Sequence, residues 1–373
     1  MIIKVFYGYD VAMLKQLKVI TAMSGGVDSS VSAQLLKDEG YVVQGIYMRN
    51  WTEEFEKNGQ IICPQQTDET DARQVASQIG IPFSVVNFEK EYAQSVLDYL
   101  FKEYAAGRTP NPDILCNREI KFKIFLEKAL SLGADLVATG HYVRKRQNQT
   151  TGLWELLKGV DGNKDQSYFL ATITQDQLTH ALFPVGDYKK SQIRELAKKN
   201  GLIVHSKPDS QGLCFVGEVR IKNFLQTKLA PKKGAIITVD GQKIGEHDGV
   251  WYYTIGQRRG FGYGGGNQLP YYVVDKDLQK NILYVASGAD HPALFKQELT
   301  ASNLHWISNI QPTANSIIQA KIRYRQTDQD CLITEFDSNT CKVTFTEPQR
   351  AITPGQFIVF YNKEICLGGG IIN

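Results

Sequence analysis

Ser24-Gly25-Gly26-Val27-Asp28-Ser29-Ser30 is the stretch that decides the fold, because it joins a predicted buried strand to a predicted helix. The apolar run 19–23 precedes it, and the run 31–36 has the spacing of a helix. A glycine-rich turn at a helix start points backbone N–H groups at an anion, and the helix dipole and serine hydroxyls add attraction. The stretch therefore predicts a phosphate site, but not a Walker loop, because no Gly-Lys-Ser/Thr follows.

Composition limits the class of protein. The chain has 373 residues, which predicts two or three domains, and 42% hydrophobic residues, which is typical of a soluble globular protein. The formal net charge of +3 means that any nucleic-acid binding must come from local patches. No apolar segment is long enough to span a membrane. Residues 1–13 are expected to be a short extension, with Met13 as an alternative start.

The cysteines indicate the compartment. The six cysteines are scattered and include no Cys-x-x-Cys pair, which argues against a disulfide scaffold or a metal cluster. We therefore expect a reducing, cytoplasmic location and no protein metal ligands.

Strands and helices alternate through the first half of the chain. Strands are predicted at 41–48, 83–87 and 135–139, and helices at 67–79, 89–104 and 117–130. This order predicts an α/β fold with a doubly wound parallel sheet, whose ligands bind beyond the carboxyl ends of the strands. Ser24 and Gly140 both lie at such ends.

The second half changes character. After predicted helices at 189–200 and 224–229, short alternating segments dominate from Gly234, and Asp240-Gly241 predicts a hairpin turn. The last predicted strands suggest a small closed β-barrel: 317–324, 331–336, 341–345, 356–361 and 365–371. The expected domains are a catalytic domain at 1–222, a central β-rich domain at 223–298 and the barrel at 299–373.

Two cysteines have contexts that suit chemistry. Cys116 is expected one residue before a helix, where helix-start amides, Arg118 and Lys121 would favour the nucleophilic thiolate. Cys214 lies in a turn-like string, 209–217. A single cysteine in apolar surroundings is usually a small buried hydrophobe, and that is the expectation for Cys331, Cys341 and Cys366. Cys63 precedes Pro64 in an irregular loop and is expected to take no part in the chemistry.

Taken together, these motifs resemble those of the tRNA-specific 2-thiouridylases, which replace O2 of the wobble uridine with sulfur. The resemblance runs from about Leu17 to the C-terminus, with Ala22 standing where the family usually has glycine. The matching segments are 24–30, 109–122, 138–142, 164–169, 209–217, 253–258, 322–326, 353–356 and 366–370.

The resemblance implies an adenine nucleotide α-hydrolase-like first domain that cleaves ATP between the α and β phosphates. AMP is then transferred to the uridine O2, and a Mg²⁺ ion offsets the phosphate charge. The residues that the resemblance implies for ATP are Ala22, Met23, Ser24, Gly25, Gly26, Val27, Asp28, Ser29, Met48 and Gly140.

For sulfur transfer, the resemblance implies a persulfide on Cys214 and Cys116 as the nucleophile that splits the remaining S–S bond, leaving a Cys116–Cys214 disulfide. Alternatively, Cys116 first releases sulfide, which then attacks. Asn111, Pro112 and Asp113 would receive the target base, with Asp113 as a candidate acid–base or, alternatively, a loop cap. The implied tRNA contacts are His141, Lys164, Asp165, Gln166, Arg323, Tyr324 and Gln356.

The implied partners are a tRNA with a wobble uridine (Lys, Glu and Gln acceptors) and a persulfide donor, either a sulfur-relay protein or a cysteine desulfurase. No membrane partner is expected. Two other functions stay open at this point. An adenylating synthetase that uses ammonia would not need the two thiols, and a non-catalytic RNA-binding protein would release no pyrophosphate.

Overall fold

The computed structural model describes residues 16–51, 55–57, 60–62, 64–209, 221–258, 260, 269–337 and 339–373. Its first part is built on a parallel sheet in the order β5-β2-β1-β6-β9. The order reverses between β1 and β6, where ligands of such sheets bind. The predicted doubly wound sheet is confirmed. The strands are β1 (Lys18–Ala22), β2 (Val42–Arg49), β5 (Phe83–Asn87), β6 (Leu136–Ala138) and β9 (Ala181–Leu182).

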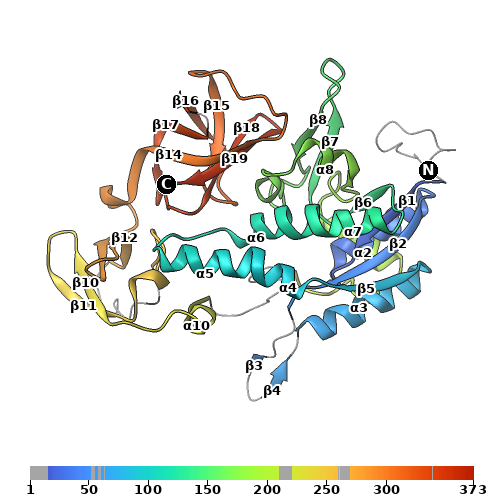
Figure 1. Ribbon diagram of the computed structural model, residues 1–373, viewed down its shortest axis with the longest axis horizontal. Coiled ribbons are helices and arrows are strands. Elements are labelled where there is room, and N and C mark those ends of the chain that lie inside the picture. Colours follow the sequence, from blue (N-terminus) through green and yellow to red (C-terminus); the bar gives the residue numbers. More distant parts are fainter. Residues whose placement is uncertain are drawn as a thin grey trace.

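Helices cover both faces of this sheet (Figure 1). Side chains alternate along β1, so that Val19 packs on one face and Ile20 on the other. The face of Val19 is covered by α2 (Val27–Asp38), α3 (Pro64–Ile79) and α9 (Lys190–Lys199). The face of Ile20 is covered by a helix made of α4 (Glu89–Tyr92), η2 (Ala93–Leu97) and α5 (Asp98–Ala105), and by a second one made of α6 (Pro112–Leu115), η3 (Cys116–Ile124) and α7 (Phe125–Ser131).

The helix that carries Cys116 starts earlier than the sequence predicts. It begins at Pro112, and the side chain of Asn111 caps it by accepting a hydrogen bond from the Ile114 amide at 3.2 Å. Proline suits the first helical turn because the missing N–H would have no partner there. The expectation that Cys116 precedes the helix is therefore wrong: Cys116 lies inside it, so the free helix-start amides are not at its thiol.

The central part of the chain forms a four-stranded sheet in the order β11-β10-β13-β12. The predicted hairpin is confirmed, with Gly241 at a φ of +87° in its turn. The helix before this sheet begins and ends three residues before the predicted one. The elements are α10 (Ile221–Gln226), β10 (Gly234–Thr238), β11 (Lys243–His247), β12 (Tyr271–Asp277) and β13 (Ile282–Ser287).

The last strands close into an antiparallel barrel, as predicted, because β14 pairs with both β17 and β19. Its strands are β14 (Phe295–Trp306), β15 (Ile317–Lys321), β16 (Gln329–Phe336), β17 (Thr340–Arg350), β18 (Phe357–Asn362) and β19 (Ile365–Ile372). A hairpin of β7 (Val143–Gln147) and β8 (Trp154–Lys158) continues this sheet from β19 (Figure 1). The sequence does not predict this hairpin, because the run Arg144-Lys145-Arg146 in its first strand has the pattern of a basic surface cluster.

The remaining elements are short and were not predicted: β3 (Phe55–Lys57), β4 (Gln60–Ile62), η4 (Ser167–Leu170), α8 (Gln175–His180), η5 (Val250–Tyr252) and η6 (Pro292–Leu294). Among the described residues, the helices are all too short or too polar to cross a bilayer. The domain bounds at 222 and 298 stay a prediction.

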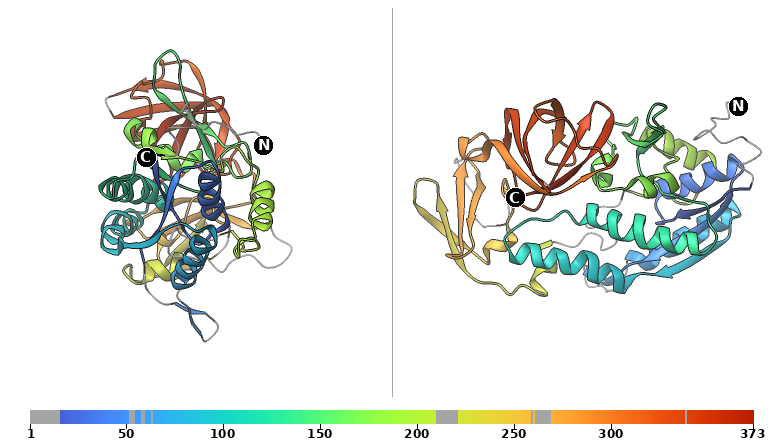
Figure 2. Two further views of the ribbon diagram at one scale, coloured as in Figure 1. Left: turned by 90° about the vertical axis from the view of Figure 1, so that its right-hand side faces the viewer. Right: turned by 45° about the horizontal axis from the view of Figure 1, so that its top comes forward.

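The helix at 112–131 lies between two apolar cores. Leu115, Cys116 and Ile120 pack in the core that includes β1 and the central sheet. Ile114 and Phe122 pack in the core that includes β18 and β19 of the barrel. Figure 2 shows this helix beginning near the barrel and running away from it toward the parallel sheet. One helix therefore connects the packing of the different parts of the chain.

We expect Phe122→Ala to destabilise the protein by about 3–5 kcal/mol, because it leaves a cavity in this core. The Phe122 side chain is 1% exposed and its ring centroid lies 6.1 Å from that of Phe183. Urea unfolding followed by tryptophan fluorescence measures the loss. Leu132→Ala is the control, since Leu132 is 40% exposed; equal unfolding midpoints for the two variants would contradict this packing.

Candidate functional site

The turn between β1 and α2 has a backbone that only glycine can supply. Gly25 has a φ of +73°, and a Cβ at this position would lie 2.1 Å from the Asp68 carbonyl oxygen of α3. The hydroxyls of Ser24 and Ser29 lie 3.1 Å apart, and the Ser29 hydroxyl accepts from the Ser24 amide at 3.1 Å. The hydroxyl of Ser30 donates to the Gly26 carbonyl at 2.7 Å. These contacts fix the shape of the turn.

Gly140 brings the end of β6 against this turn. A Cβ at Gly140 would lie 2.7 Å from the Ser29 amide nitrogen. The two strand ends therefore meet at the point where the strand order reverses, as the sequence predicts. Because neither Gly25 nor Gly140 carries a side chain, these backbone segments can pack closely around the start of α2, whose first amides suit an anion. Ala22, Met23 and Met48 lie nearby in the sheet as buried residues.

Asp28, in the first turn of α2, is neutralised by its neighbours. Its carboxylate accepts hydrogen bonds from the Lys190 ammonium at 2.7 and 2.8 Å and from the Tyr142 hydroxyl at 2.7 Å. An unpaired carboxylate at this position would repel a phosphate. The Lys190 contact removes much of that repulsion.

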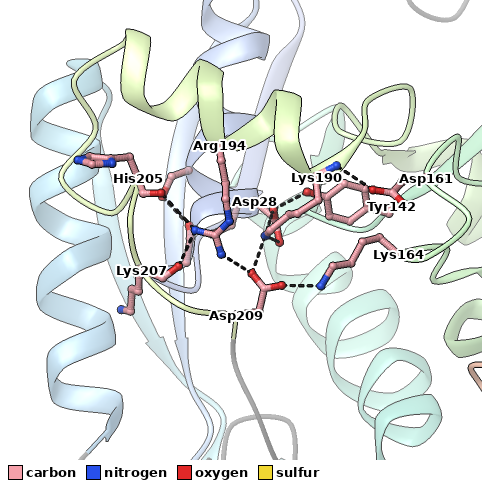
Figure 3. Close-up of polar contacts among 12 residues, drawn as sticks. Asp28, Tyr142, Asp161, Lys164, Lys190, Arg194, His205, Lys207 and Asp209 are labelled. Carbon is pink, nitrogen blue, oxygen red and sulfur yellow. Dashed lines mark hydrogen bonds and ion pairs between the residues drawn. The ribbon is translucent and has the colours of Figure 1, made fainter.

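Asp209 is the centre of a charged cluster beside Asp28 (Figure 3). Its carboxylate accepts from the Lys164 ammonium, from Lys190 at 2.8 Å and from Arg194 at 2.9 Å. Burial alone would raise the pKa of Asp209, but the bonds from Lys164 and Lys190 outweigh it and lower the pKa to about 2. Lys190 therefore joins Asp209 to Asp28. We call the β1–α2 turn, residues 24–30, the phosphate turn after its predicted role.

Lys207 fastens the same turn from another side. Its ammonium donates to the Gly25 carbonyl at 3.0 Å and to the carboxylates of Asp68, at 2.7 Å, and Asp71. Burial tends to lower the pKa of Lys207, but the two carboxylates raise it above its usual value. From the sequence, Lys190 belongs to a basic pair, 189–190, that would suit phosphate contacts, and Arg194 and Lys207 have no expected role. Their carboxylate partners are mostly far away in sequence, so the only sequence feature that could have pointed to these residues is their position in basic or motif segments.

Cys116 is completely buried, between Leu115 and Asn117 of the helix. Asp113 lies in the first turn of this helix, partly exposed, beside Pro112. Cys214 and Cys63 lie outside the described residues, so the pairing of Cys116 with Cys214 stays a prediction. Cys331, Cys341 and Cys366 are buried in barrel strands, where burial raises the pKa of each thiol above its usual value.

Several residues implied as tRNA contacts have partners inside the protein. Asp165 is buried and accepts from the amides of Gly159 and Ser167, while Gln166 accepts from the Tyr142 amide at 2.9 Å. His141 is buried against Phe122, and its Nδ1 lies 2.7 Å from the Thr139 hydroxyl. Burial and the charge of Lys121 hold the pKa of His141 well below its usual value, so the ring is neutral at pH 7.

The three implied tRNA contacts in the C-terminal part of the chain, Arg323, Tyr324 and Gln356, also have partners inside the protein. Arg323 donates to the Thr353 hydroxyl at 2.6 Å and the Ala351 carbonyl at 3.2 Å. The Tyr324 ring lies 4.3 Å from that of Phe169. Gln356 donates to the carbonyls of Thr109, at 2.8 Å, and Pro110, at 3.2 Å. The contacts of Tyr324 and Gln356 place both next to the catalytic part of the chain, whereas those of Arg323 stay within the C-terminal part. The role of all three toward tRNA stays a prediction.

Within the described part of the chain, no group of three or more His, Cys, Asp or Glu residues could hold a metal ion. Asp28 is the carboxylate at the phosphate turn. A Mg²⁺ ion in this type of site is held largely by the substrate phosphates with one or two carboxylates. The residues present therefore fit a magnesium ion that arrives with a nucleotide.

Three protein-family models match the chain. Residues 17–218 match the tRNA methyl transferase HUP domain, residues 222–287 the tRNA methyl transferase PRC-barrel domain, and residues 296–372 the aminomethyltransferase beta-barrel domain. Together they span most of the chain.

Full-length relatives match as well. The chain is 51% identical to the tRNA-specific 2-thiouridylase MnmA of Nitrosomonas europaea, over 96% of this chain and 99% of the relative. The enzymes of the same name from Marinomonas sp. and Pseudomonas aeruginosa are also 51% identical, over 95% of this chain and 91% and 94% of theirs.

Solved structures show only distant likeness. A 4-thiouridine synthetase–RNA complex with bound ATP has a TM-score of 0.37 and 20% identity, over 57% of this chain and 50% of that one. An NMN synthetase from Francisella tularensis has a TM-score of 0.32 and 16% identity, over 58% of this chain and 82% of that one.

We expect Asp209→Asn to destabilise the protein near pH 7 by about 1–2 kcal/mol, because the lowered pKa of Asp209 measures its favourable pairing. For a carboxyl with a lowered pKa, this contribution is present above the unfolded value of 3.8 and is lost as the pH falls toward about 2. Unfolding free energies of wild type and variant should therefore converge between pH 4 and 2. Asp176→Asn, with an 83% exposed side chain, is the control, and a pH-independent difference would contradict the assignment.

Proposed function

Because this chain belongs to the tRNA-specific 2-thiouridylase family, we propose that it carries out ATP-dependent 2-thiolation of the wobble uridine in tRNA. The identity of 51% over 96% of the chain is the observation that carries the proposal. The family-model names refer to methyl transfer. The full-length relatives decide between the two names, because relatives that are 51% identical over almost the whole chain carry the name tRNA-specific 2-thiouridylase.

The first step uses the phosphate turn. The uridine O2 attacks the α-phosphorus of ATP, pyrophosphate leaves, and O2 carries AMP. The first amides of α2 support phosphate binding, in the turn formed by Gly25 and Gly26 and packed against Gly140. Ala22, Met23, Val27 and Met48 are buried and supply apolar surface at the same strand ends. Ser24, Asp28 and Ser29 complete the proposed ATP site.

Magnesium is part of the proposal. When bound with ATP, Mg²⁺ supplies positive charge that offsets the charge on the phosphates. Asp28 is the residue that would contact it, in exchange for a contact with Lys190 or Tyr142.

The second step uses the thiols. A persulfide on Cys214 attacks C2 of the activated uridine, the C2–O bond breaks, and AMP leaves with O2. Cys116 then attacks the Cys214 sulfur, the S–S bond breaks to leave sulfur on the base, and a dithiol reductant opens the resulting disulfide. Alternatively, Cys116 attacks first and releases sulfide as the nucleophile. Because Cys116 is completely buried, either order requires the surroundings of its thiol to open.

The finer parts of the proposal concern partners. Asn111, Pro112 and Asp113 begin the helix that carries Cys116, which supports their role in receiving the base. Direct contact with tRNA is proposed for seven residues that also have contacts within the protein. They are His141, Lys164, Asp165, Gln166, Arg323, Tyr324 and Gln356. We further propose acceptors for Lys, Glu and Gln, a sulfur-relay protein or cysteine desulfurase as donor, a cytoplasmic location, and domains at 1–222, 223–298 and 299–373.

The test is a reconstituted reaction. Full-length protein is incubated with ATP, Mg²⁺, a persulfide donor and unmodified tRNA, and 2-thiouridine and pyrophosphate are measured. We expect both products from wild type. Cys116→Ala and Cys214→Ala should each lower 2-thiouridine formation at least a hundredfold while tRNA-dependent pyrophosphate release continues, because adenylation precedes sulfur transfer.

Cys341→Ala is the matched control, since Cys341 is buried in β17 and has no proposed role. It should thiolate tRNA at the wild-type rate. Pyrophosphate release with full thiolation in both thiol variants would rule out the sulfur chemistry. Tight tRNA binding by wild type without pyrophosphate release would indicate a binding protein instead.

A further inference from the structure

The loop at 107–111 precedes the helix that carries Cys116, and contacts from the other two parts of the chain hold it. Gly107 ends the helix of α5, and its carbonyl accepts a hydrogen bond from the ammonium of Lys276 in β12. The turn after β12 also packs here, because a Cβ at Gly107 would lie 2.4 Å from a methyl carbon of Leu278. The central sheet therefore sits directly on the start of the loop.

Lys276 makes this contact with a desolvated ammonium. The same group donates to the Tyr253 carbonyl at 2.8 Å, and burial lowers the pKa of Lys276 to about 8, although Asp275 acts in the opposite direction. A charged group is placed in such surroundings at a cost, and its hydrogen bonds offset that cost. Removing the ammonium leaves two carbonyls without this donor.

Thr109 is held from two sides. Its hydroxyl lies 3.1 Å from the hydroxyl of Thr254 in the central part of the chain. Its amide donates to the Pro354 carbonyl of the barrel at 2.9 Å, and its carbonyl accepts from Gln356. The barrel backbone also approaches closely, since a Cβ at Gly355 would lie 2.9 Å from the Thr109 nitrogen.

We propose that Lys276, Thr254 and Gln356 are positioning residues that hold the loop at 107–111, and through it set the position of Asn111 and Cys116. The proposal rests on the proposed function for the role of Cys116. The connection is short, because Asn111 directly follows the held segment and caps the helix in which Cys116 lies. A reacting group displaced by about 1 Å can lose on the order of a hundredfold in rate.

Two readouts test the proposal on the full-length protein. The first is the rate at which N-ethylmaleimide modifies Cys116, followed by mass spectrometry of its peptide. A buried thiol reacts only when its surroundings open, so this rate measures how firmly the helix start is held. The second is the kcat for thiolation, measured together with the KM for ATP. The contacts of Lys276 and Thr254 are not at the phosphate turn, so their loss should change kcat and leave the KM for ATP nearly unchanged.

The main variants are Lys276→Met, which keeps the apolar stem, and Thr254→Val, which keeps the shape and removes the hydroxyl. We expect each to raise the Cys116 modification rate at least fivefold and to lower kcat at least fivefold, with the KM for ATP within twofold. If Lys276→Met does not fold, Thr254→Val decides.

Lys145→Met is the matched control. Lys145 is also buried, donates to two carbonyls, those of Leu178 at 2.8 Å and Thr179 at 3.0 Å, and has its pKa lowered to about 7 by burial. It should leave the Cys116 modification rate within twofold of wild type. Wild-type rates in Lys276→Met and Thr254→Val, or an equal increase in Lys145→Met, would overturn the proposal. If the wild-type protein does not thiolate tRNA, only the proposed function is rejected. The Cys116 modification rates would still show whether these residues hold the loop at 107–111.

Discussion

The structure depends on the burial of one helix, 112–131, on two sides. A helix that carries apolar residues on two sides must be covered on both. Leu115, Cys116 and Ile120 meet the core of the parallel sheet, and Ile114 and Phe122 meet the core at the barrel. Because neighbouring residues of the helix serve different cores, the sheet and the barrel cannot shift independently without opening one of them. The candidate nucleophile, Cys116, thus lies in the helix that packs against both cores.

The phosphate turn depends on a different kind of interaction. Lys190, Lys207 and Arg194 each pair with a carboxylate, so the cluster around Asp28 and Asp209 is close to electrically balanced before an anion arrives. Attraction for a phosphate then comes chiefly from backbone amides and the helix dipole. The paired side chains hold those amides in place, and they connect the turn to α3 and α9 through contacts distant in sequence.

Several residues that the resemblance assigns to tRNA binding also have structural contacts within the protein. Asp165 and His141 are buried, and Gln356 binds the loop before Asn111. A motif shared by a family reports that a residue matters, but it does not separate contact with a substrate from support of the residues that make that contact. For Gln356 both can hold, because its amide group reaches the catalytic part of the chain from the barrel.

The sequence by itself determined the local elements whose signal lies within a few residues. The glycine pair between an apolar strand and a helix, the alternation of strands and helices, the Asp-Gly hairpin and the barrel strands all follow from spacing, and the structure has them. It misplaced the start of the Cys116 helix, because Asn111 and Pro112 suit both a loop and a helix cap. Only the tertiary structure decided the β7–β8 hairpin on the barrel, the pairing of Asp209 with three cations, and the hold of Lys276 on Gly107. Those contacts join residues far apart in the chain, and their free energy comes from desolvation and geometry that no local pattern records.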